Sequence, residues 1–472
     1  MMLRRLWPLA LCSVLFVAGC PSPTPRLSSG PALSDKELEA LEAVQLAWDT
    51  SRAQGSQLWP GFLLHEVPLL IFRPGNRSFA VNPGFDPELA TRISDPRFSE
   101  VVWMLDSKAL PYSAGLPFAR DVEWQGHRFF LVRHTDGSER KSWFRLVVHE
   151  IFHEWQQSWR PAQFPEACRY PYGDGQNAFA ARAEEMMLAR MMVPARPEEL
   201  DGPLAEYLAV RSSRYRSGAG GAAADAAAIE DWEERIEGTA RYVEEAYAVA
   251  AHLAAPSAAA EELVRYFKTF RPGDLQKWKY YRVGLALGRL LDLLEDTDWK
   301  DACREGQSPF RYALGLLADE TAEKVASVPT VLARYQGERQ AVEDSLAAYL
   351  ATEQELIDTW KGEGPVRVEL VLPAGGRNAY YSNRGPTIQL PDCHRLATGV
   401  TAYVDITHGL EILARGVATR NGPQLARVVF HADIESAVVH LDGEKVAPDD
   451  MDRPFQRSIV IQGTGWKLDS RG

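Results

Sequence analysis

Cysteine is scarce in this chain, with only five among 472 residues, at positions 12, 20, 168, 303 and 393. The last three cannot all pair with one another, so at most one disulfide is expected among them, and their spacing fits no cysteine-based metal site. A net positive charge is also lacking, because the formal net charge is −12, and no basic cluster occurs. Because nucleic acids are bound by positively charged surfaces, we expect no nucleic-acid partner.

Long hydrophobic runs are absent after the first twenty residues. At the N-terminus, Arg4 and Arg5 precede an apolar run over residues 6–16, which is short for a bilayer span. Val17-Ala18-Gly19-Cys20 closes this run and resembles a bacterial lipobox, whose cysteine becomes the lipidated N-terminus. The alternative is an ordinary secretory signal with an incidental cysteine.

The lipobox resemblance implies a signal peptide over residues 1–20 and a lipid anchor on Cys20, which would make the membrane a partner of the mature protein. A bacterial cell-envelope location follows. Pro21 after the cysteine favours the outer membrane, facing the periplasm or the cell surface. Nothing in the sequence indicates an oligomeric state.

Composition divides the remaining chain into a tether, a large body and a C-terminal part. Residues 21–34 are rich in Pro, Ser, Thr and Gly, which is typical of a flexible tether. The body, residues 35–362, is expected to hold a small sheet within 59–135 and helices over 141–360. Apolar and polar residues then alternate, which predicts a separate antiparallel β domain over 365–472. The predicted fold class is α+β.

Local patterns predict particular elements. We expect a helix over Asp35–Arg52, with Ser34 as its N-cap. A hairpin turn is expected at Gln125-Gly126. The Gly- and Ala-rich residues Ser217–Ala228 are expected to form a flexible loop, although the alanines could also extend a helix. The predicted strands of the first sheet are Phe62–Leu64, Pro68–Phe72, Val101–Leu105, Val122–Trp124 and Phe129–Val132. Those of the C-terminal part are Val366–Leu372, Thr401–Ile406, Arg427–Ala432, Ala437–Leu441 and Ser458–Gln462, with a turn at Asp442-Gly443.

Residues 149–153 read His-Glu-Ile-Phe-His, inside a stretch without Gly or Pro from Lys141 to Arg160. A helix brings residues four apart onto one face, so His149 and His153 could bind one metal ion there. Zinc suits paired imidazoles, and Glu150 beside them could act as a general base. The alternative is an amphipathic helix with two unrelated histidines.

A catalytic zinc site needs a third protein ligand and an open position for water. Two predicted helices contain glutamates that could complete the site. Residues 180–192 contain Glu184 and Glu185, and residues 232–247 read WEERIEGTARYVEEAY. The remaining acids Glu185, Glu233, Glu234 and Glu245 are expected to be surface charges.

The segment Glu237-Gly238-Thr239-Ala240-Arg241-Tyr242-Val243-Glu244 is similar to one in the aminopeptidase N-like gluzincins and their peptidase MA-like relatives. Farther along, Tyr281-Arg282-Val283-Gly284 resembles the Tyr-x-x-Gly segment of the same family. The resemblance implies a zincin fold, with Glu237 as the third zinc ligand and Tyr281 stabilising the oxyanion. Tyr280 is the neighbouring alternative.

Glu184 remains a rival third ligand, because its distance in sequence from His153 also suits a gluzincin helix. The glutamate that does not bind the metal is expected to support the site from the next layer of residues.

These features predict a hydrolase that binds one zinc ion and acts on a peptide or protein. The leading hypothesis is a zinc metallopeptidase on the extracytoplasmic side of the membrane. One alternative is a zinc amidase acting on cell-wall peptides. Another is a non-catalytic surface lipoprotein stabilised by a metal.

Overall fold

The computed structural model describes residues 32–362, apart from 74, 108–109, 111–118, 135–136, 160–169, 173–174, 193–198 and 218–220, together with the strands between residues 366 and 471. The predicted signal peptide, Cys20 and most of the predicted tether lie outside the described residues. In the described part, no helix combines the length and the apolar composition needed to cross a membrane.

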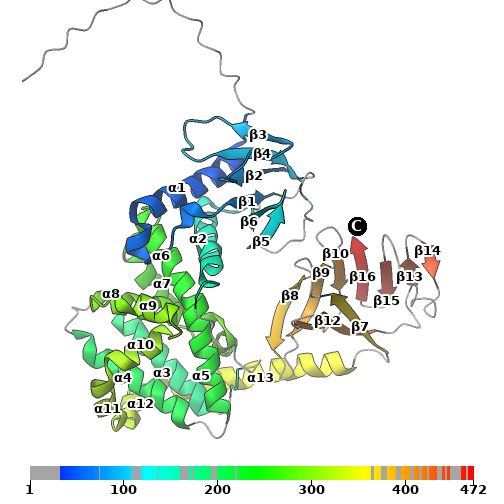
Figure 1. Cartoon of the computed structure of the whole chain (residues 1–472). Coiled ribbons are helices and arrows are strands. Elements are labelled where there is room, and N and C mark those ends of the chain that lie inside the picture. Colours follow the sequence, from blue (N-terminus) through cyan, green and yellow to red (C-terminus); the bar gives the residue numbers. More distant parts are fainter. Residues whose placement is uncertain are drawn as a thin grey trace, which may run out of the picture.

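Helices make up most of the body, as predicted (Figure 1). The α-helices are α1 (Asp35–Leu58), α2 (Arg140–Gln156), α3 (Gly175–Met191), α4 (Asp201–Ser217), α5 (Gly221–Glu233), α6 (Thr239–Ala250), α7 (Ala258–Tyr266), α8 (Trp278–Leu293), α9 (Asp298–Arg304), α10 (Pro309–Leu316), α11 (Ala318–Val325), α12 (Val328–Ala333) and α13 (Arg339–Gly362). A π-helical turn, η4 (Glu234–Gly238), joins α5 to α6. Short 3₁₀ turns are η1 (Leu64–Glu66), η5 (Pro272–Gln276) and η6 (Gln336–Glu338).

The start of α1 confirms the predicted cap. The backbone N–H of Ser34 donates to the Glu37 carboxylate at 2.7 Å, and the Ser34 hydroxyl accepts from the Glu37 N–H at 3.4 Å. This reciprocal pair satisfies two donors that the first turn would otherwise leave free. The helix continues to Leu58, beyond the predicted end at Arg52.

The first sheet is mixed and has six strands in the order β3-β4-β2-β1-β6-β5. Within it, β1 and β6 are parallel and the other neighbours are antiparallel. The strands are β1 (Leu69–Phe72), β2 (Arg77–Val81), β3 (Ala90–Ile93), β4 (Val102–Asp106), β5 (Ala119–Trp124) and β6 (His127–Arg133). The predicted strand at Phe62–Leu64 is wrong, because Phe62 packs in the core and Leu64 begins η1.

Both faces of this sheet are covered. In β1, Leu69 and Ile71 belong to the main core shared with the helices, whereas Leu70 and Phe72 belong to a smaller core on the other face. Four consecutive apolar residues are therefore all buried, as in strands covered on both sides. The predicted turn at Gln125-Gly126 is confirmed, with positive φ angles of 51° and 77° that suit a tight hairpin.

The prediction of a flexible loop over Ser217–Ala228 is wrong for most of its length. Helix α4 continues through Ser217, and α5 begins at Gly221 and contains the alanines. Alanine has the highest helix propensity, and here it outweighs the glycines that suggested a loop.

After α13 ends at Gly362, strands β7–β16 pair antiparallel in one sheet. Their bounds are β7 (Val366–Pro373), β8 (Tyr380–Gln389), β9 (Arg395–Tyr403), β10 (Gly409–Leu413), β11 (Val417–Asn421), β12 (Leu425–Ala432), β13 (Val438–Leu441), β14 (Glu444–Val446), β15 (Ile459–Gly463) and β16 (Trp466–Arg471). The predicted turn residues Asp442-Gly443 lie outside the described residues. A separate C-terminal domain stays a prediction.

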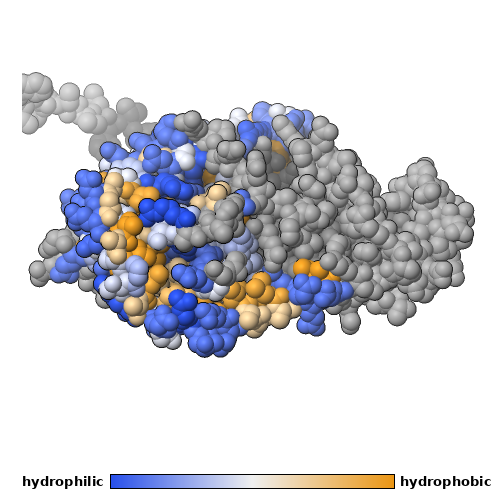
Figure 2. Space-filling view, turned by 90° about the horizontal axis from the view of Figure 1, so that it is seen from below, coloured by the Kyte–Doolittle hydropathy of each residue, from blue (hydrophilic) through white to orange (hydrophobic). Residues whose placement is uncertain are grey.

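Hydrophilic residues cover much of the described surface seen from below, and apolar residues gather in patches (Figure 2). The exposed large apolar side chains include Leu89, Val101, Trp278, Leu293 and Leu316.

Beside its histidines, α2 packs against Trp59 through Phe152, and Trp159 follows just after the helix ends. The Trp59 ring lies 5.1 Å from that of Phe152 and 5.7 Å from that of Trp159, centroid to centroid. It also lies 5.3 Å from the ring of Trp299 and 6.0 Å from that of Tyr242. Large rings with few rotatable bonds fix the rotation of α2 about its axis.

Helix α8 crosses the end of η4 at a contact between two glycines. A Cβ atom on Gly284 would lie 2.5 Å from the Cα of Gly238, and one on Gly238 would lie 2.8 Å from both the Gly284 Cα and the Tyr280 carbonyl oxygen. The two backbones therefore touch, and neither position has room for a side chain. This contact brings Glu237 and Tyr281, from distant parts of the chain, to one place.

Replacing Gly284 with Ala should force the two backbones apart and lower the free energy of unfolding by about 1–3 kcal/mol. Denaturant unfolding followed by circular dichroism measures this loss. The matched control is Gly315→Ala on α10, where a Cβ meets nothing within 4 Å. That control should be neutral or gain up to about 1 kcal/mol. Equal stability of the Gly284→Ala variant and the native protein would contradict the tight contact.

Candidate metal centre

Three side-chain atoms converge on one point between α2 and η4. Nε2 of His149 lies 3.0 Å from Nε2 of His153, which lies 3.1 Å from Oε2 of Glu237. The third separation, between His149 Nε2 and Glu237 Oε2, is 3.5 Å. His149, His153 and Glu237 thus form a group that could hold a metal ion. The structure thus brings together His149 and His153, which the helical spacing predicted, and Glu237, which the family resemblance implied.

The size of this triangle fits a zinc ion. Ligand atoms about 2.0–2.1 Å from a tetrahedral Zn²⁺ lie about 3.3–3.4 Å from one another. The observed separations of 3.0, 3.1 and 3.5 Å bracket that value. One ion above the triangle would keep a fourth position for water or substrate.

Gln156 determines which nitrogen of His153 faces the site. The Gln156 amide donates to the Ile236 carbonyl at 2.8 Å and to the Thr239 hydroxyl at 2.9 Å, so its oxygen faces His153. That oxygen lies 2.7 Å from Nδ1 of His153 and can only accept a hydrogen bond. Nδ1 therefore carries the proton, and the lone pair of Nε2 is directed at Glu237 and His149.

Glu244 on α6 lies beside the outer ring nitrogen of His149. Its Oε2 lies 3.2 Å from Nδ1 of His149, which leaves Nε2 facing the site. Arg241 forms an ion pair with Glu244, and Nε of Arg145 lies 3.9 Å from its carboxylate. Our sequence reasoning gave Glu244 no role. Its spacing of seven residues from Glu237 could have indicated this position, because residues two helical turns apart lie on the same face of a helix.

The surroundings favour positive charge at this point. Burial alone would lower the pKa of His149, but contacts with Glu237 and Glu244 raise that pKa to about 9. Burial likewise opposes ionisation of Glu237, yet His149 and His153 hold its pKa well below the ordinary range. Without a metal, the protonated His149 supplies that positive charge. A metal cation would take its place by displacing the proton, since a ligand imidazole binds a metal only in its neutral form.

Lys277, which precedes α8, binds the other oxygen of Glu237. Its Nζ lies 2.9 Å from Oε1, so Oε2 is left as the single donor toward the histidines. The Lys277 side chain is 36% exposed.

Tyr281 lies on the first turn of α8, beside His149. The two rings are parallel within 2° and their centroids are 5.9 Å apart. Burial and the neighbouring Glu237 carboxylate raise the pKa of Tyr281 well above its ordinary value, so the hydroxyl is a protonated donor. Tyr280 is fully buried, with its ring 5.9 Å from the Arg211 guanidinium. Of the two tyrosines, Tyr281 is the one beside the triangle.

Glu150 follows His149 on α2 and is partly buried. Its charge contributes to the raised pKa values of His149 and Tyr281, so it lies near both. Among the described residues, its carboxylate has no hydrogen-bond or ion-pair partner. It is therefore free to accept a proton from a water molecule or substrate.

Glu184 lies apart from the triangle. Its carboxylate accepts from Arg214 at 2.6 and 3.0 Å and lies 3.4 Å from Nζ of Lys279. It is therefore neither the third donor nor the support of a histidine, because both oxygens are committed to cations. The surface positions expected for three other acids are also wrong, because all three are buried: Glu185, Glu234 and Glu245.

Glu184 belongs to a buried charge network. Its cations are Arg211, Arg214 and Lys279, and its carboxylates are Glu184, Glu230 and Glu234. Burial raises the pKa of Glu234 to about 7, although Arg211 at 2.6 Å opposes that rise. The network joins α3, α4, α5, η4 and α8, and so fixes the two elements that carry Glu237 and Tyr281.

No protein-family model, curated protein or solved structure matches this chain.

Glu237→Gln should remove most bound zinc, because an amide oxygen replaces the charged donor. The Glu184→Gln variant should still bind one zinc ion per folded chain. Its free energy of unfolding should fall by about 3 kcal/mol or more, because the buried cations Arg214 and Lys279 lose their anionic partner. Metal analysis of the folded fraction, combined with denaturant unfolding, measures both effects. If the Glu184 variant lost zinc and the Glu237 variant kept it, Glu184 and not Glu237 would be the metal ligand.

Glu244→Gln should weaken zinc affinity by about 10–100-fold, as is typical when the support of a metal-binding histidine is removed. Competition with a chromogenic chelator measures the affinity. Glu262→Gln is the matched control, because Glu262 also pairs with Arg241 but is 37% exposed. The two variants behaving alike would show that Glu244 does not orient His149.

Proposed function

We propose that this protein is a zinc-dependent peptidase of the gluzincin type. The observation that carries this proposal is the triangle of His149, His153 and Glu237, with the unpartnered Glu150 and the Tyr281 ring beside it. A purely structural zinc site is normally closed by a fourth protein ligand. In the described residues, the group contains three ligands.

Zinc bound here would lower the pKa of a water molecule to about 7 and polarise the substrate carbonyl. Glu150 accepts a proton from the attacking water, since its carboxylate is not engaged by another described side chain. The same group then gives that proton to the leaving amine, so one residue serves as base and as acid.

Tyr281 donates a hydrogen bond to the oxygen that gains negative charge as the carbonyl is attacked. Its ring lies between two others, 5.2 Å from the Trp278 ring and 5.9 Å from the His149 ring. A donor already in position costs no reorganisation during the reaction, and removing such a donor costs about 2.7–4 kcal/mol.

The first sheet offers a place for an extended peptide. Strand β5 ends the strand order and pairs antiparallel with β6, and α2 contacts both strands. An edge strand can bind a peptide by main-chain hydrogen bonds, as in β-strand addition. We propose that a substrate peptide binds along this edge of a zincin-like domain. The proposed domain order places a C-terminal β domain after it.

The proposed setting is the bacterial cell envelope, with the protein anchored by a lipid on Cys20. The N-terminal sequence alone supports this part of the proposal. An extracytoplasmic peptidase would meet unfolded proteins and cell-wall peptides alike, so the assay must separate these substrates.

Glu150→Gln should keep zinc bound and lose turnover, whereas Tyr281→Phe should lower kcat by about 10²–10³-fold with little change in KM. Cleavage of casein and of purified peptidoglycan, with zinc content measured in parallel, tests both variants. Glu154→Gln, one turn along α2 and paired with Arg128, is the matched control and should retain activity.

Release of cell-wall peptides without cleavage of casein would favour the amidase. A native protein that binds zinc but hydrolyses neither substrate would favour the non-catalytic lipoprotein. Native activity in Glu150→Gln would overturn the proposed mechanism.

A further inference from the structure

A cavity of about 570 Å³ lies where α3 ends, between α7 and the C-terminal end of α8. It is separate from the metal centre, since Tyr281 lies on the first turn of α8 whereas Arg289 and Leu293 line this cavity from its last turns. Its volume is within the range of about 300–1,000 Å³ that is usual for sites binding small molecules.

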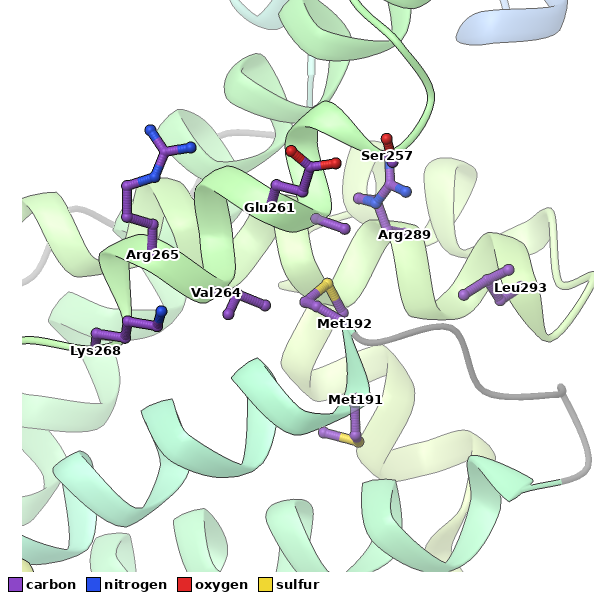
Figure 3. A pocket seen from close by; sticks show the side chains of 10 residues that line it. Met191, Met192, Ser257, Glu261, Val264, Arg265, Lys268, Arg289 and Leu293 are labelled. Carbon is purple, nitrogen blue, oxygen red and sulfur yellow. The ribbon is translucent and has the colours of Figure 1, made fainter.

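The floor of the cavity is apolar. Met192, Val264 and Leu293 lie across it in Figure 3, and Ala260 adds a small side chain from α7. Leu293 is 43% exposed and extends this apolar surface toward solvent. Methionine side chains are flexible and polarizable, so Met192 can adapt to apolar ligands of different shape.

Cationic side chains line parts of the cavity beside this apolar floor. Arg265, Lys268 and Arg289 line the cavity together with one acid, Glu261. In Figure 3, Arg289 and Glu261 lie on one side, and Arg265 and Lys268 lie toward one end. The chain has a formal net charge of −12, so this local excess of positive charge runs against its overall composition.

The three cations have donors to spare. Among the described residues, the side chains of Arg265 and Lys268 pair with no acid. Arg289 donates one hydrogen bond, 3.2 Å long, to the Pro256 carbonyl, which leaves most of its guanidinium for another acceptor.

We propose that this cavity binds a free long-chain carboxylate, with the hydrocarbon chain on the apolar floor and the carboxylate against Arg289 or Lys268. The ligand matches the site at both ends, because the methylenes leave water and the anion meets unpaired cations. This inference does not depend on the proposed peptidase activity.

An apolar peptide is a poorer match for the floor. Each buried peptide group needs hydrogen-bond partners, and its burial without them costs about 1–3 kcal/mol. Met192, Val264, Ala260 and Leu293 have no side-chain donor or strong acceptor to offer. An acyl chain makes no such demand along its length.

Titration calorimetry with palmitate tests the proposal on the full-length protein. We expect saturable binding at one site with a micromolar Kd, and at least tenfold weaker binding of methyl palmitate, which lacks the charge. Arg289→Gln should weaken palmitate binding by about tenfold, and the doubly substituted Arg289→Gln/Lys268→Gln protein should weaken it further. Lys324→Gln on α11 removes a cation elsewhere and should have no effect.

Val264→Trp should fill the cavity and abolish binding. Leu293→Glu, at an already exposed position, provides a second test if the larger side chain impairs folding. It places a negative charge beside the acyl chain and should also abolish binding. Circular dichroism confirms folding of both variants.

The proposal is overturned if palmitate does not saturate a site in the native protein, or if a folded Leu293→Glu variant binds it unchanged. Equal affinity for methyl palmitate would rule out the anionic contact. Tighter binding of phosphatidylglycerol vesicles or of an apolar peptide than of palmitate would show that the occupant is a membrane lipid or a polypeptide instead.

Discussion

Gly238 and Gly284 let two helical segments touch backbone to backbone, and the geometry of the metal centre depends on that contact. Glu237 directly precedes the first glycine, and Tyr281 lies one turn before the second. The separation between donor and tyrosine is therefore set by main-chain contact and not by flexible side chains. Beneath the crossing, paired charges from α3, α4 and η4 hold the same two segments. Burying so many charges is costly, but their mutual pairing leaves few other ways to arrange these helices.

The charges around the histidines have a common effect. Gln156 accepts from the outer nitrogen of His153, and the Glu244 carboxylate lies 3.2 Å from the outer nitrogen of His149, so both inner nitrogens face Glu237. Lys277 binds the remaining oxygen of that carboxylate. The orientation of the two imidazole rings and the position and charge of the Glu237 carboxylate are thus set by side chains from different segments of the chain. Each segment contributes a side chain whose own conformation is fixed by further contacts, which is the arrangement expected of a preorganised site.

Features encoded by local sequence could be predicted. The Ser34 cap, the Gln125-Gly126 hairpin and the helix carrying His149 and His153 depend on residues within one or two turns of each other. Glu237 and Tyr281 were reached through resemblance to a family and not through physical reasoning on spacing. Glu244, the buried position of Glu234 and the ion pairs of Glu184 depend on contacts between distant helices, which no local pattern reports. Strands β2 and β3 were not predicted. In β3, the consecutive residues Thr91 and Arg92 are both exposed, so the strand lacks the alternation of apolar and polar residues that marks a half-buried strand.

The π-helical turn η4 changes the angular order of side chains along the segment from α5 to α6. Each residue of a regular helix is rotated by about 100° about the helix axis from the residue before it. A π-helical turn holds one residue more than an α-helical turn. The side chains after η4 are therefore rotated by about 100° relative to the positions they would have in an uninterrupted α-helix. Glu230 and Glu234 can then face buried arginines while Glu237 and Glu244 face α2. Deleting Arg235 or Ile236 from η4 would remove no acidic residue. It would nevertheless rotate Glu237 and Glu244 away from the imidazoles of His149 and His153. The length of this turn, as much as its composition, thus determines where the negative charges point.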